Sequence, residues 1–407
     1  MLIVKKFGGS SVADATCIRR VAKTITDSYK EGNKVVVVLS AQGDTTDELI
    51  EKAMEINPEA SKREMDMLLA TGEQQSVALM AMAIEAMGYP VISLNAFQCN
   101  IYSTSTYSNA RIKDISTERI ENELENKNIV IITGFQGINR HLDVTTLGRG
   151  GSDTSAVALA AKLNADICEI YTDVDGVYTA DPRVVKNAVK LNEITYDEML
   201  ELATLGAKVL HNRSVELAKK YNVNLVVRSS ITNAEGTVVK EDAKVEKMLV
   251  NGVAVDKDVA RIAVIGLKDE PGVAFKIFSL LSKAKISVDL IIQSIGRSDT
   301  KDISFTVSRN ACNDALKVLT ENKASLGFED ITSNTEVAKV SIVGAGMATN
   351  PGVASMLFEA TYDEGINVKM ISTSEIKISL LVNEKDADRA ANAIHDKFIT
   401  EDLKTRR

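Results

Sequence analysis

Residues 2–10 read LIVKKFGGS, and this stretch decides the fold because an apolar run passes directly into a glycine turn. The run from Leu2 to Phe7 is too continuous for a half-exposed strand and indicates a strand buried on both faces, as in parallel sheets. A second apolar run follows at Val35 to Leu39. Between the two runs, apolar residues recur at helical spacing, at Val12, Ala15, Ile18, Val21, Ala22 and Ile25. Strand, helix and strand in this order predict a βαβ unit.

The same alternation of apolar runs and helical periods continues to about residue 240. Ile129 to Thr133 and Ile167 to Thr172 are further continuous runs, which predict buried parallel strands. We therefore expect an α/β fold with a mostly parallel sheet and helices on both faces. The charged segment Glu241 to Lys247 interrupts the pattern, so a first, catalytic domain is expected over residues 1–245.

The last third of the chain repeats itself. The tetrapeptide PGVA occurs at Pro271 and again at Pro351, 80 residues later. Ile286 to Val288 and Ile366 to Val368 match at the same offset. A repeat of this length is a small domain copied once. The two expected domains cover residues 246–335 and 336–407.

Each repeat predicts a strand, a Pro-Gly turn, a helix and further strands, such as Lys377 to Val382 in the second copy. A glycine turn that leads into a helix presents free N–H groups that can hold a carboxylate. The turn is also consistent with plain capping, in which proline lies near the helix start and glycine allows the turn. Two copies at equal offset favour a ligand-binding role.

The charge pattern does not indicate nucleic-acid binding. Lys and Arg number 48 against 56 Asp and Glu, a formal net charge of −8, and the basic residues are scattered. No stretch approaches the roughly 20 apolar residues of a membrane helix, and Met1 to Lys6 lacks the features of a signal peptide. The four cysteines form no CxxC pair, which is typical of reduced thiols in a cytoplasmic protein and does not indicate zinc.

Two glycine-rich segments are candidates for chemistry. Lys6 to Ser10 allows a phosphate to approach the backbone at a helix start, and Lys6 can neutralise a transferring phosphoryl group. It matches neither a Walker A loop nor GxGxxG, so a plain tight turn is the alternative. The second segment, GRGGSD at 148–153, precedes a predicted helix over Thr154 to Leu163. Its Arg149 offers a planar fork for a carboxylate. The alternative is that Asp153 only caps the helix and Arg149 is a solvated charge.

Two polar segments add to these. TDVDGVYTADPR at 172–183 follows a predicted strand, where open α/β sheets bind ligands, and so predicts a nucleotide site. Its spacing excludes an EF-hand, because the glycine comes too early and no glutamate completes the loop. Thr71 to Ser76 interrupts a long helical pattern, and Glu73 is either a partner for an ammonium group or an exposed helix carboxylate. The three histidines form no triad or metal spacing and receive no role.

In combination these segments resemble the aspartate kinases of the amino-acid kinase family, and the repeats resemble their ACT domains. The matching segments are Lys6 to Ser10, Ser40 to Gly43, Thr46 and Asp47, Thr71 to Ser76, 148–153, 172–183, Gly206 to His211 and Ile371 to Lys377. The resemblance covers residues from about 1 to 400 and implies the amino-acid kinase fold followed by two ferredoxin-like α+β ACT domains. Asn212 departs from the family, where proline is expected after His211.

The resemblance implies transfer of the γ-phosphoryl group of ATP to the side-chain carboxylate of L-aspartate, giving 4-phospho-L-aspartate on the route to lysine, threonine and methionine. A carboxylate is already a nucleophile at neutral pH, so catalysis should rest on positioning and charge neutralisation. ATP chemistry also implies Mg²⁺, for which the sequence shows no dedicated set of ligands.

The resemblance also assigns roles to individual residues. The implied catalytic residues are Lys6 and Asp153. The implied substrate-binding residues are Ser40, Thr46, Glu73, Arg149 and Ser152. The implied nucleotide-binding residues are Lys6, Gly8, Gly9, Thr172, Asp173, Tyr178, Arg183 and Lys208.

Feedback control by lysine, threonine or both is a further implication, together with a homo-oligomer joined through the ACT repeats. Lys268 to Glu270 in the first repeat corresponds to Ala348 to Asn350 in the second, so only the first copy supplies acids for an effector ammonium group. The implied effector residues are Asp269, Gly272, Ala274, Ile286, Gln293 and Asn367.

Two other hypotheses stay open. One is a related amino-acid kinase with a different carboxylate substrate. The other is a catalytically inactive amino-acid sensor that kept the fold, although the joint presence of the five residues Lys6, Glu73, Arg149, Asp153 and Lys208 argues against it.

Overall fold

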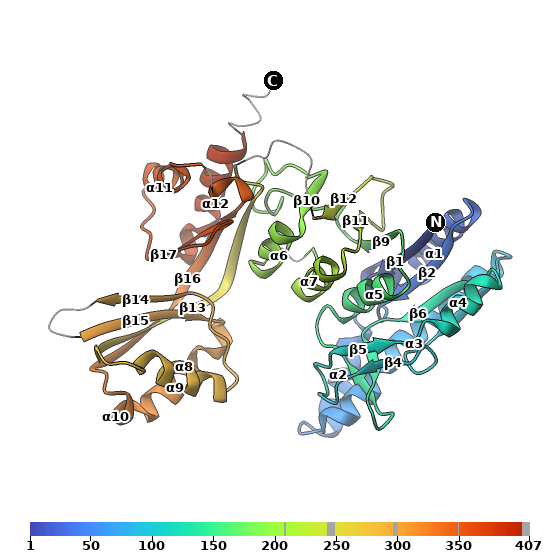
Figure 1. The fold of residues 1–407 in the computed structure, drawn as a ribbon, viewed down its shortest axis with the longest axis horizontal. Helices are drawn as coiled ribbons and strands as arrows, with labels where there is room; N and C mark the ends of the chain where they lie inside the picture. Colours follow the sequence, from blue (N-terminus) through green and yellow to red (C-terminus); the bar gives the residue numbers. More distant parts are fainter. Residues whose placement is uncertain (207–208, 242–248, 296–299, 349, 401–407) are drawn as a thin grey trace. The chain divides into compact units, whose positions relative to one another are not determined.

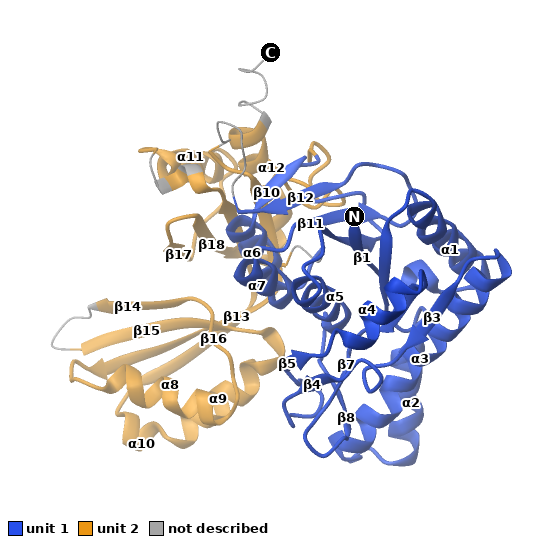
Figure 2. Ribbon diagram, turned by 45° about the vertical axis from the view of Figure 1, so that its right-hand side comes forward, with its two compact units in different colours: residues 1–177, 190–204, 208–245 blue, residues 178–189, 205–207, 246–407 orange. Residues whose placement is uncertain are grey.

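The structure, a computed structural model, describes residues 1–206, 209–241, 249–295, 300–348 and 350–400 (Figure 1). The chain forms two compact units, which Figure 2 shows in different colours. The first comprises residues 1–177, 190–204 and 208–245, and the second comprises 178–189, 205–207 and 246–407. None of the helices within the described ranges has the length and apolar content that a bilayer span requires.

An eight-stranded sheet forms the centre of the first unit. In spatial order its strands are β10 (Glu193–Thr195), β12 (Thr237–Lys240), β11 (Leu225–Ser229), β9 (Ile167–Thr172), β1 (Leu2–Phe7), β2 (Lys34–Leu39), β6 (Ile129–Thr133) and β3 (Val91–Leu94). Every neighbouring pair is parallel except β11 with β12. The four continuous apolar runs of the sequence are β1, β2, β6 and β9, so the predicted buried parallel strands are confirmed.

Helices cover both faces of this sheet, as predicted. α1 (Ala15–Lys30) and α3 (Lys62–Ala86) pack on one face, in a core that contains Phe7. α5 (Gly151–Lys162) lies on the other face, because Lys6 reaches Asp153 in that helix and side chains alternate along a strand. The remaining helical elements of the unit are η1 (Gly9–Val12), α2 (Thr45–Ile56), α4 (Glu118–Glu125), α6 (Tyr196–Thr204) and α7 (Asn212–Tyr221).

The long helix α3 is continuous. Ser61 caps its start by accepting a hydrogen bond from the Glu64 N–H at 3.4 Å. The expected interruption at Thr71 to Ser76 is wrong, because one interior glycine costs only about 1 kcal/mol and packing compensates. At Gly72 a Cβ atom would lie 2.9 Å from the Cβ of Ala41, so the glycine allows a close approach between the helix and the loop after β2.

A second, smaller sheet in the first unit was not predicted. Its strands, in order, are β5 (Ile112–Ile115), β4 (Ile101–Ser103), β7 (Gln136–Ile138) and β8 (Val144–Thr146). It brings the polar segment after β3 beside the segment after β6. Strands of three or four residues contain too few alternating positions to be recognised in a sequence.

A six-stranded antiparallel sheet runs through the second unit. Its strands, in order, are β14 (Ile291–Ile295), β15 (Thr300–Val307), β13 (Gly252–Lys268), β16 (Asp330–Val343), β18 (Lys377–Asn383) and β17 (Met370–Thr373). The helical elements are α8 (Val273–Lys283), η2 (Arg309–Ala311), α9 (Cys312–Glu321), α10 (Lys323–Leu326), η3 (Ala345–Ala348), α11 (Val353–Asp363), η4 (Glu384–Asp386), α12 (Ala387–His395) and η5 (Asp396–Thr400).

The sequence repeat corresponds to two similar halves of this unit. α8 and α9 pack in one core, and α11 and α12 pack in another. Gly272 precedes α8 with φ of 89°, and Gly352 precedes α11 with φ of 99°. Both PGVA turns therefore use a left-handed cap that glycine adopts readily. The predicted duplication is confirmed.

The two repeats share the long strands β13 and β16. Residues 252–256 of β13 pair with 339–343 of β16, whereas 261–265 pair with 330–334. Val250 and Val253 lie in the core of the second repeat, so the first repeat is inserted between parts of the second. The domain boundaries expected at 245/246 and 335/336 stay predictions, and residues 242–248 lie outside the described ranges.

Residues 178–189 also contribute to the core of the second repeat. Ala180 and Val185 are buried in that core. The carbonyl of Thr179 accepts a hydrogen bond from the Val253 N–H at 2.7 Å, and Thr179 Oγ1 lies 2.8 Å from Nε2 of the buried His395. The second half of the TDVDGVYTADPR segment is therefore held by the second unit.

Candidate active site

An ion pair lies at the carboxyl edge of the large sheet. Lys6 is in β1, and its Nζ lies 2.7 Å from Oδ1 of Asp153, in the first turn of α5. Each side chain is only 12% exposed. Gly150 is the N-cap of α5, so the alternative that Asp153 only caps this helix is wrong. The two residues predicted to be catalytic thus meet at the edge where open α/β sheets bind ligands.

The glycine turn after β1 packs against the loop after β2. The Gly43 N–H donates to the carbonyl of Gly9 at 3.0 Å. A Cβ atom at Gly9 would lie 2.6 Å from the carbonyl oxygen of Ala41, so no larger residue fits without moving the loop. This packing brings together four of the predicted site residues, Lys6, Gly8, Gly9 and Ser40. Thr46 follows in the first turn of α2.

Glu73 contacts the same loop from α3. Its side chain is buried, and Oε1 accepts a hydrogen bond from the Ala41 N–H at 3.1 Å. Oε2 is buried without a hydrogen-bond partner among the described residues. Burial raises the pKa of Glu73 to about 7, and the bond from Ala41 opposes that shift. The alternative of an exposed helix carboxylate is therefore wrong, and the unpaired oxygen suits a cationic ligand group.

The GRGGSD loop needs its glycines. Gly148 and Gly150 have φ of 78° and 67°, in the left-handed region. A Cβ atom at Gly150 would lie 2.2 Å from Cγ of His211, so the loop packs directly on that ring. Ser152 is buried against Gly134, whereas the side chain of Arg149 is exposed.

His211, which received no role from the sequence, lies against the GRGGSD loop. Besides packing on Gly150, its ring Nδ1 accepts a hydrogen bond from the Arg213 N–H at 3.3 Å at the start of α7. Burial lowers the pKa of His211, and the charge of Asp153 acts in the opposite direction. Asn212, where proline was expected, is the first residue of α7, a position at which proline is also favoured. The signal for His211 was its place in the segment Gly206 to His211.

The residues predicted to bind the nucleotide are divided between the units. Thr172 ends β9, and its Oγ1 donates to Asp173 Oδ1 at 2.9 Å. Tyr178 and Arg183 belong to the second unit, where Arg183 forms an ion pair of 2.8 Å with Asp181. Lys208 lies outside the described residues.

Comparison with known proteins identifies the chain. Residues 1–229 match the model of the amino acid kinase family, and residues 262–322 and 340–398 match an ACT domain model. The aspartokinase of Corynebacterium glutamicum is 49% identical over 403 residues, which cover 98% of this chain and 96% of that protein. That of Bacillus sp. strain MGA3 is 50% identical over 398 residues, which cover 98% and 97%. The chain belongs to the aspartokinase family.

Solved structures agree with this membership. E. coli aspartokinase III in complex with aspartate and ADP has a TM-score of 0.82 at 26% identity, covering 98% of this chain and 99% of that one. The same enzyme in complex with lysine and aspartate has a TM-score of 0.78 at 26% identity and the same coverage. The aspartate kinase of Synechocystis is 45% identical, with a TM-score of 0.56, and covers 98% of this chain and 69% of its own. The chain is thus an ATP-using aspartate kinase with the amino-acid kinase fold and C-terminal ACT domains, and the predicted family and fold class are confirmed.

The predicted effector residues of this aspartokinase lie mainly in the first repeat. Asp269, before the PGVA turn, forms an ion pair with Lys301 in β15. Ile286 lines a hollow of about 360 Å³ between α8 and β14. Gly272 is the N-cap of α8, Ala274 lies in its first turn and Gln293 is exposed on β14. Asn367 is exposed in the second repeat. The structure therefore places five of the six residues around one turn, one helix and one strand.

Proposed function

We propose that the chain phosphorylates the side-chain carboxylate of L-aspartate with ATP, giving 4-phospho-L-aspartate, the first intermediate on the route to lysine, threonine and methionine. One observation carries the proposal, namely that the loop after β2 contacts two groups at once. The carbonyl oxygen of Ala41 packs closely on Gly9, and the N–H of Ala41 donates a hydrogen bond to Glu73. A glycine turn suited to phosphate and a buried carboxylate suited to an ammonium group thus both contact Ala41, which supports a site for a nucleotide and an amino acid together.

Lys6 and Asp153 supply the electrostatics of the transfer in this proposal. Asp153 holds the Lys6 ammonium group next to the glycine turn, where Gly8 leaves a phosphate free access to the backbone. The positive charge is then in place before negative charge develops on the transferring group. No general base is needed, because the attacking carboxylate of aspartate is already ionised.

Glu73 and Arg149 fix the orientation of the amino acid. The unpaired Oε2 of Glu73 binds the substrate ammonium group, and the guanidinium of Arg149 binds the α-carboxylate as a fork. Ser40, Thr46 and Ser152 complete the substrate site. With both ends of the backbone held, the side-chain carboxylate is the group left to face the phosphoryl donor. E. coli aspartokinase III, solved with aspartate and ADP, supports this choice of ligands.

The nucleotide is held by Thr172, Asp173, Tyr178, Arg183 and Lys208 in this proposal, with Lys6, Gly8 and Gly9 at the phosphates. Mg²⁺ accompanies ATP and screens its phosphate charge. Among the described residues, no group of three His, Cys, Asp or Glu side chains is placed to hold a metal ion. Mg²⁺ usually keeps phosphate oxygens and water among its ligands.

Feedback control completes the proposal. Lysine, threonine or both bind the first repeat at Asp269, Gly272, Ala274, Ile286 and Gln293, with Asn367 of the second repeat closing the site in a homo-oligomer. The effector ammonium group competes with Lys301 for the carboxylate of Asp269. E. coli aspartokinase III has been solved in complex with lysine, which supports this class of effector. The cytoplasmic location expected from the four cysteines, all unpaired, is part of the same proposal.

The test is a coupled assay of ADP release by the full chain with aspartate, glutamate or N-acetylglutamate, each with and without lysine and threonine. We expect ADP release with aspartate and inhibition by at least one of the two effectors. Turnover of glutamate or N-acetylglutamate in preference to aspartate would contradict the substrate assignment. An absence of turnover with all three would favour the inactive sensor.

A further inference from the structure

Asp66, a residue to which the proposed function gives no role, receives hydrogen bonds from two loops. It lies on α3 and is fully buried, with 0% of its surface exposed. The N–H of Ser108 donates to both carboxylate oxygens at 3.0 and 2.9 Å, and Ser108 Oγ donates at 3.2 Å. The N–H and Oγ1 of Thr146 each donate at 2.8 Å. One carboxylate thus accepts from four donors on two distant segments.

The first of these segments is strained at Ser108. This residue has φ of 64°, in the left-handed region that residues other than glycine seldom occupy. Such a conformation persists only where surrounding contacts determine it, and the contacts here are those with Asp66. The carbonyl oxygen of Ser108 in turn packs on Gly148, where a Cβ atom would lie only 3.1 Å away. Ser108 therefore fixes the residue directly before Arg149.

The second segment leads into the same loop. Thr146 ends β8, two residues before Gly148, and its carbonyl accepts from the Ala110 N–H at 2.9 Å. Arg213 in α7 links the two segments, because its guanidinium donates hydrogen bonds to the carbonyls of Leu147 at 2.8 Å and Ala110 at 2.7 Å. The backbone that leads into the loop at 148–153, which we call the arginine loop, is thereby tied to Asp66.

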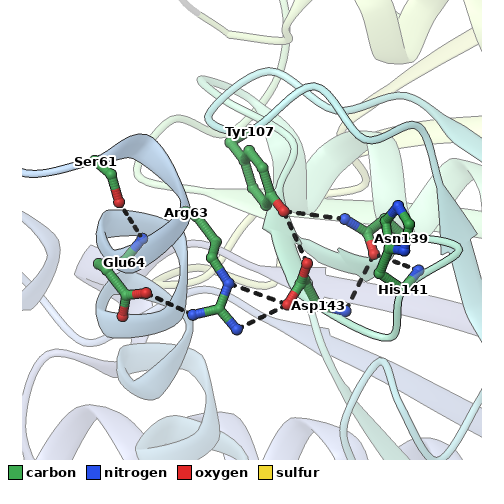
Figure 3. A network of polar contacts seen from close by, with 7 residues as sticks. All are labelled: Ser61, Arg63, Glu64, Tyr107, Asn139, His141 and Asp143. Atoms are coloured by element: carbon green, nitrogen blue, oxygen red, sulfur yellow. Dashed lines mark hydrogen bonds and ion pairs between the residues drawn. The ribbon is translucent and has the colours of Figure 1, made fainter.

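Figure 3 shows a second polar network, near the start of α3, which is only partly open to solvent. Arg63 forms an ion pair with Asp143 at 2.7 Å, and the Tyr107 hydroxyl donates to Asp143 at 2.8 Å. Asn139 donates to the Tyr107 hydroxyl at 3.3 Å. These groups join the same helix and the same two segments, and the ion pair between the exposed Arg63 and the half-buried Asp143 is open to solvent on the arginine side.

We infer that Asp66 is a positioning residue for aspartate recognition, which acts by holding the backbone that presents Arg149. The inference rests on the proposed function, because it takes Arg149 as the ligand of the substrate α-carboxylate. Asp66 and Glu73 are seven residues apart on α3, about two helical turns, and so lie on one face. A single helix thus carries the carboxylate for the substrate ammonium group and the anchor of the arginine loop.

The test compares Asp66→Asn with Asp143→Asn in the full-length enzyme. The asparagine at 66 places an NH₂ group against N–H and O–H donors, so the loop loses at least one bond and gains a repulsion. We expect the aspartate KM to rise about 10- to 100-fold, as for a misplaced binding group, while the ATP KM stays within about twofold. The matched change at the half-buried Asp143, whose partner Arg63 is exposed to solvent, should alter neither constant by more than about twofold.

Two further measurements separate positioning from general stability. Hydrogen exchange of the peptides containing Ser108 and Thr146 should accelerate in Asp66→Asn, whether or not substrate is bound. In an Arg149→Lys background, Asp66→Asn should raise the aspartate KM by less than about threefold more, since residues acting through one group are not additive. If Asp66→Asn does not fold, Thr146→Val and Ser108→Ala take its place in the test, because both keep the backbone hydrogen bonds to Asp66. Each of these variants should raise the aspartate KM about threefold.

The inference is overturned if exchange accelerates but the aspartate KM is unchanged, or if the KM values of aspartate and ATP rise together. Additive effects of Asp66→Asn and Arg149→Lys would overturn it as well. A failure of the proposed function is distinguishable from these outcomes, because it would appear in the unsubstituted enzyme as an absence of aspartate-dependent ADP release.

Discussion

Lys6 carries the positive charge nearest the glycine turn, and its neighbour Lys5 offers a matched control. We expect Lys6→Ala to lower kcat by about 10²- to 10³-fold with little change in the aspartate KM, because the charge is needed where phosphoryl charge develops. Lys5 is buried on the opposite side of β1 and pairs with Glu169. Lys5→Met should lower the melting temperature but spare kcat. Near-normal turnover of Lys6→Ala in steady-state assays would remove Lys6 from the mechanism.

Glu73 should make both stability and substrate binding depend on pH. Its pKa of about 7 in the folded chain lies above its ordinary value of 4.5. Between these two values the folded state holds a proton that the unfolded state has released, so stability falls as pH rises through this window. Because only the ionised form attracts an ammonium group, aspartate affinity should instead increase up to about pH 7 and then level off.

The comparison is between the unsubstituted chain and Glu73→Gln, by thermal melting and aspartate titration from pH 5 to about pH 8.5. We expect the melting temperature of Glu73→Gln to fall less steeply as pH rises than that of the unsubstituted chain, because the titration of Glu73 is absent. The aspartate affinity of Glu73→Gln should be weaker and independent of pH over the same range. Parallel pH profiles for the two proteins would show that Glu73 does not titrate in this window.

The residues predicted from sequence lie in short segments with a local signal, whereas the missed residue depends on partners that are distant in sequence. Lys6 and Asp153 lie in short segments that carry their own signals, a glycine turn after a strand and a polar helix start. Asp66 has no such signal, because its partners lie 42 and 80 residues away. Only the folded chain brings Ser108 and Thr146 to it.

Two left-handed helix caps allow a prediction for the elements that they begin. Gly150 caps α5 and Gly272 caps α8, with φ of 67° and 89°. A Cβ atom at Gly150 would overlap His211, whereas a Cβ atom at Gly272 would meet no atom of the described residues within 4 Å, apart from its chain neighbours and its own helix backbone. Gly272→Ala should therefore cost about 1 to 2 kcal/mol of stability, from backbone strain alone. Gly150→Ala should cost more and should also impair aspartate use, because the arginine loop must move.

Thermal melting and aspartate kinetics of the two variants test this difference. Equal losses of stability would mean that the contact between Gly150 and His211 relaxes without cost. A loss of aspartate turnover in Gly272→Ala alone would contradict the placement of the substrate site at α5.

Elements were predictable in proportion to their length and regularity. The buried runs of β2 and β6 were recognised because four or five consecutive apolar residues leave few alternatives, and β1 and β9 were recognised as shorter apolar runs of the same kind. The break expected in α3 was wrong, because Gly72 is explained by its close packing on Ala41 and does not end the helix. Ala41 is distant in sequence, so this contact could not be predicted locally. The small sheet was not predicted, because its short strands pair with each other and not with the main sheet.

Regulation is a property of the whole chain, and Asp269 tests it. We expect Asp269→Ala to keep most of the activity without effector but to resist lysine or threonine, because loss of one charged contact removes much of a coupling that is typically about 1 to 3 kcal/mol. In the absence of effector, Asp269 pairs with Lys301, so a modest loss of stability is also expected. Inhibition curves and melting temperatures of both proteins are the measurement. An unchanged half-inhibition concentration for every effector would overturn the assignment, and a loss of stability alone would mean that Asp269 only supports the turn.

The organisation of the whole molecule was predictable only in part. The repeat of PGVA at an 80-residue offset predicted the duplicated module. It did not predict that residues 252–256 would pair within the second repeat, because strand pairing depends on partners that the local sequence does not name. For the same reason, residues 178–189 were expected in the first unit, with the nucleotide segment that contains them.

The place of residues 178–189 has a consequence for biosynthesis. These residues pack against α12, which begins 198 positions after Val189. At about 5 to 20 residues per second, a ribosome needs roughly 10 to 40 s to make the intervening chain. During that interval the core into which Ala180 and Val185 pack is incomplete. Two proposed nucleotide contacts, Tyr178 and Arg183, therefore reach their folded surroundings only after the last helix has been made, so a prematurely terminated polypeptide would be defective in its ATP loop although it contains every residue proposed for phosphoryl transfer.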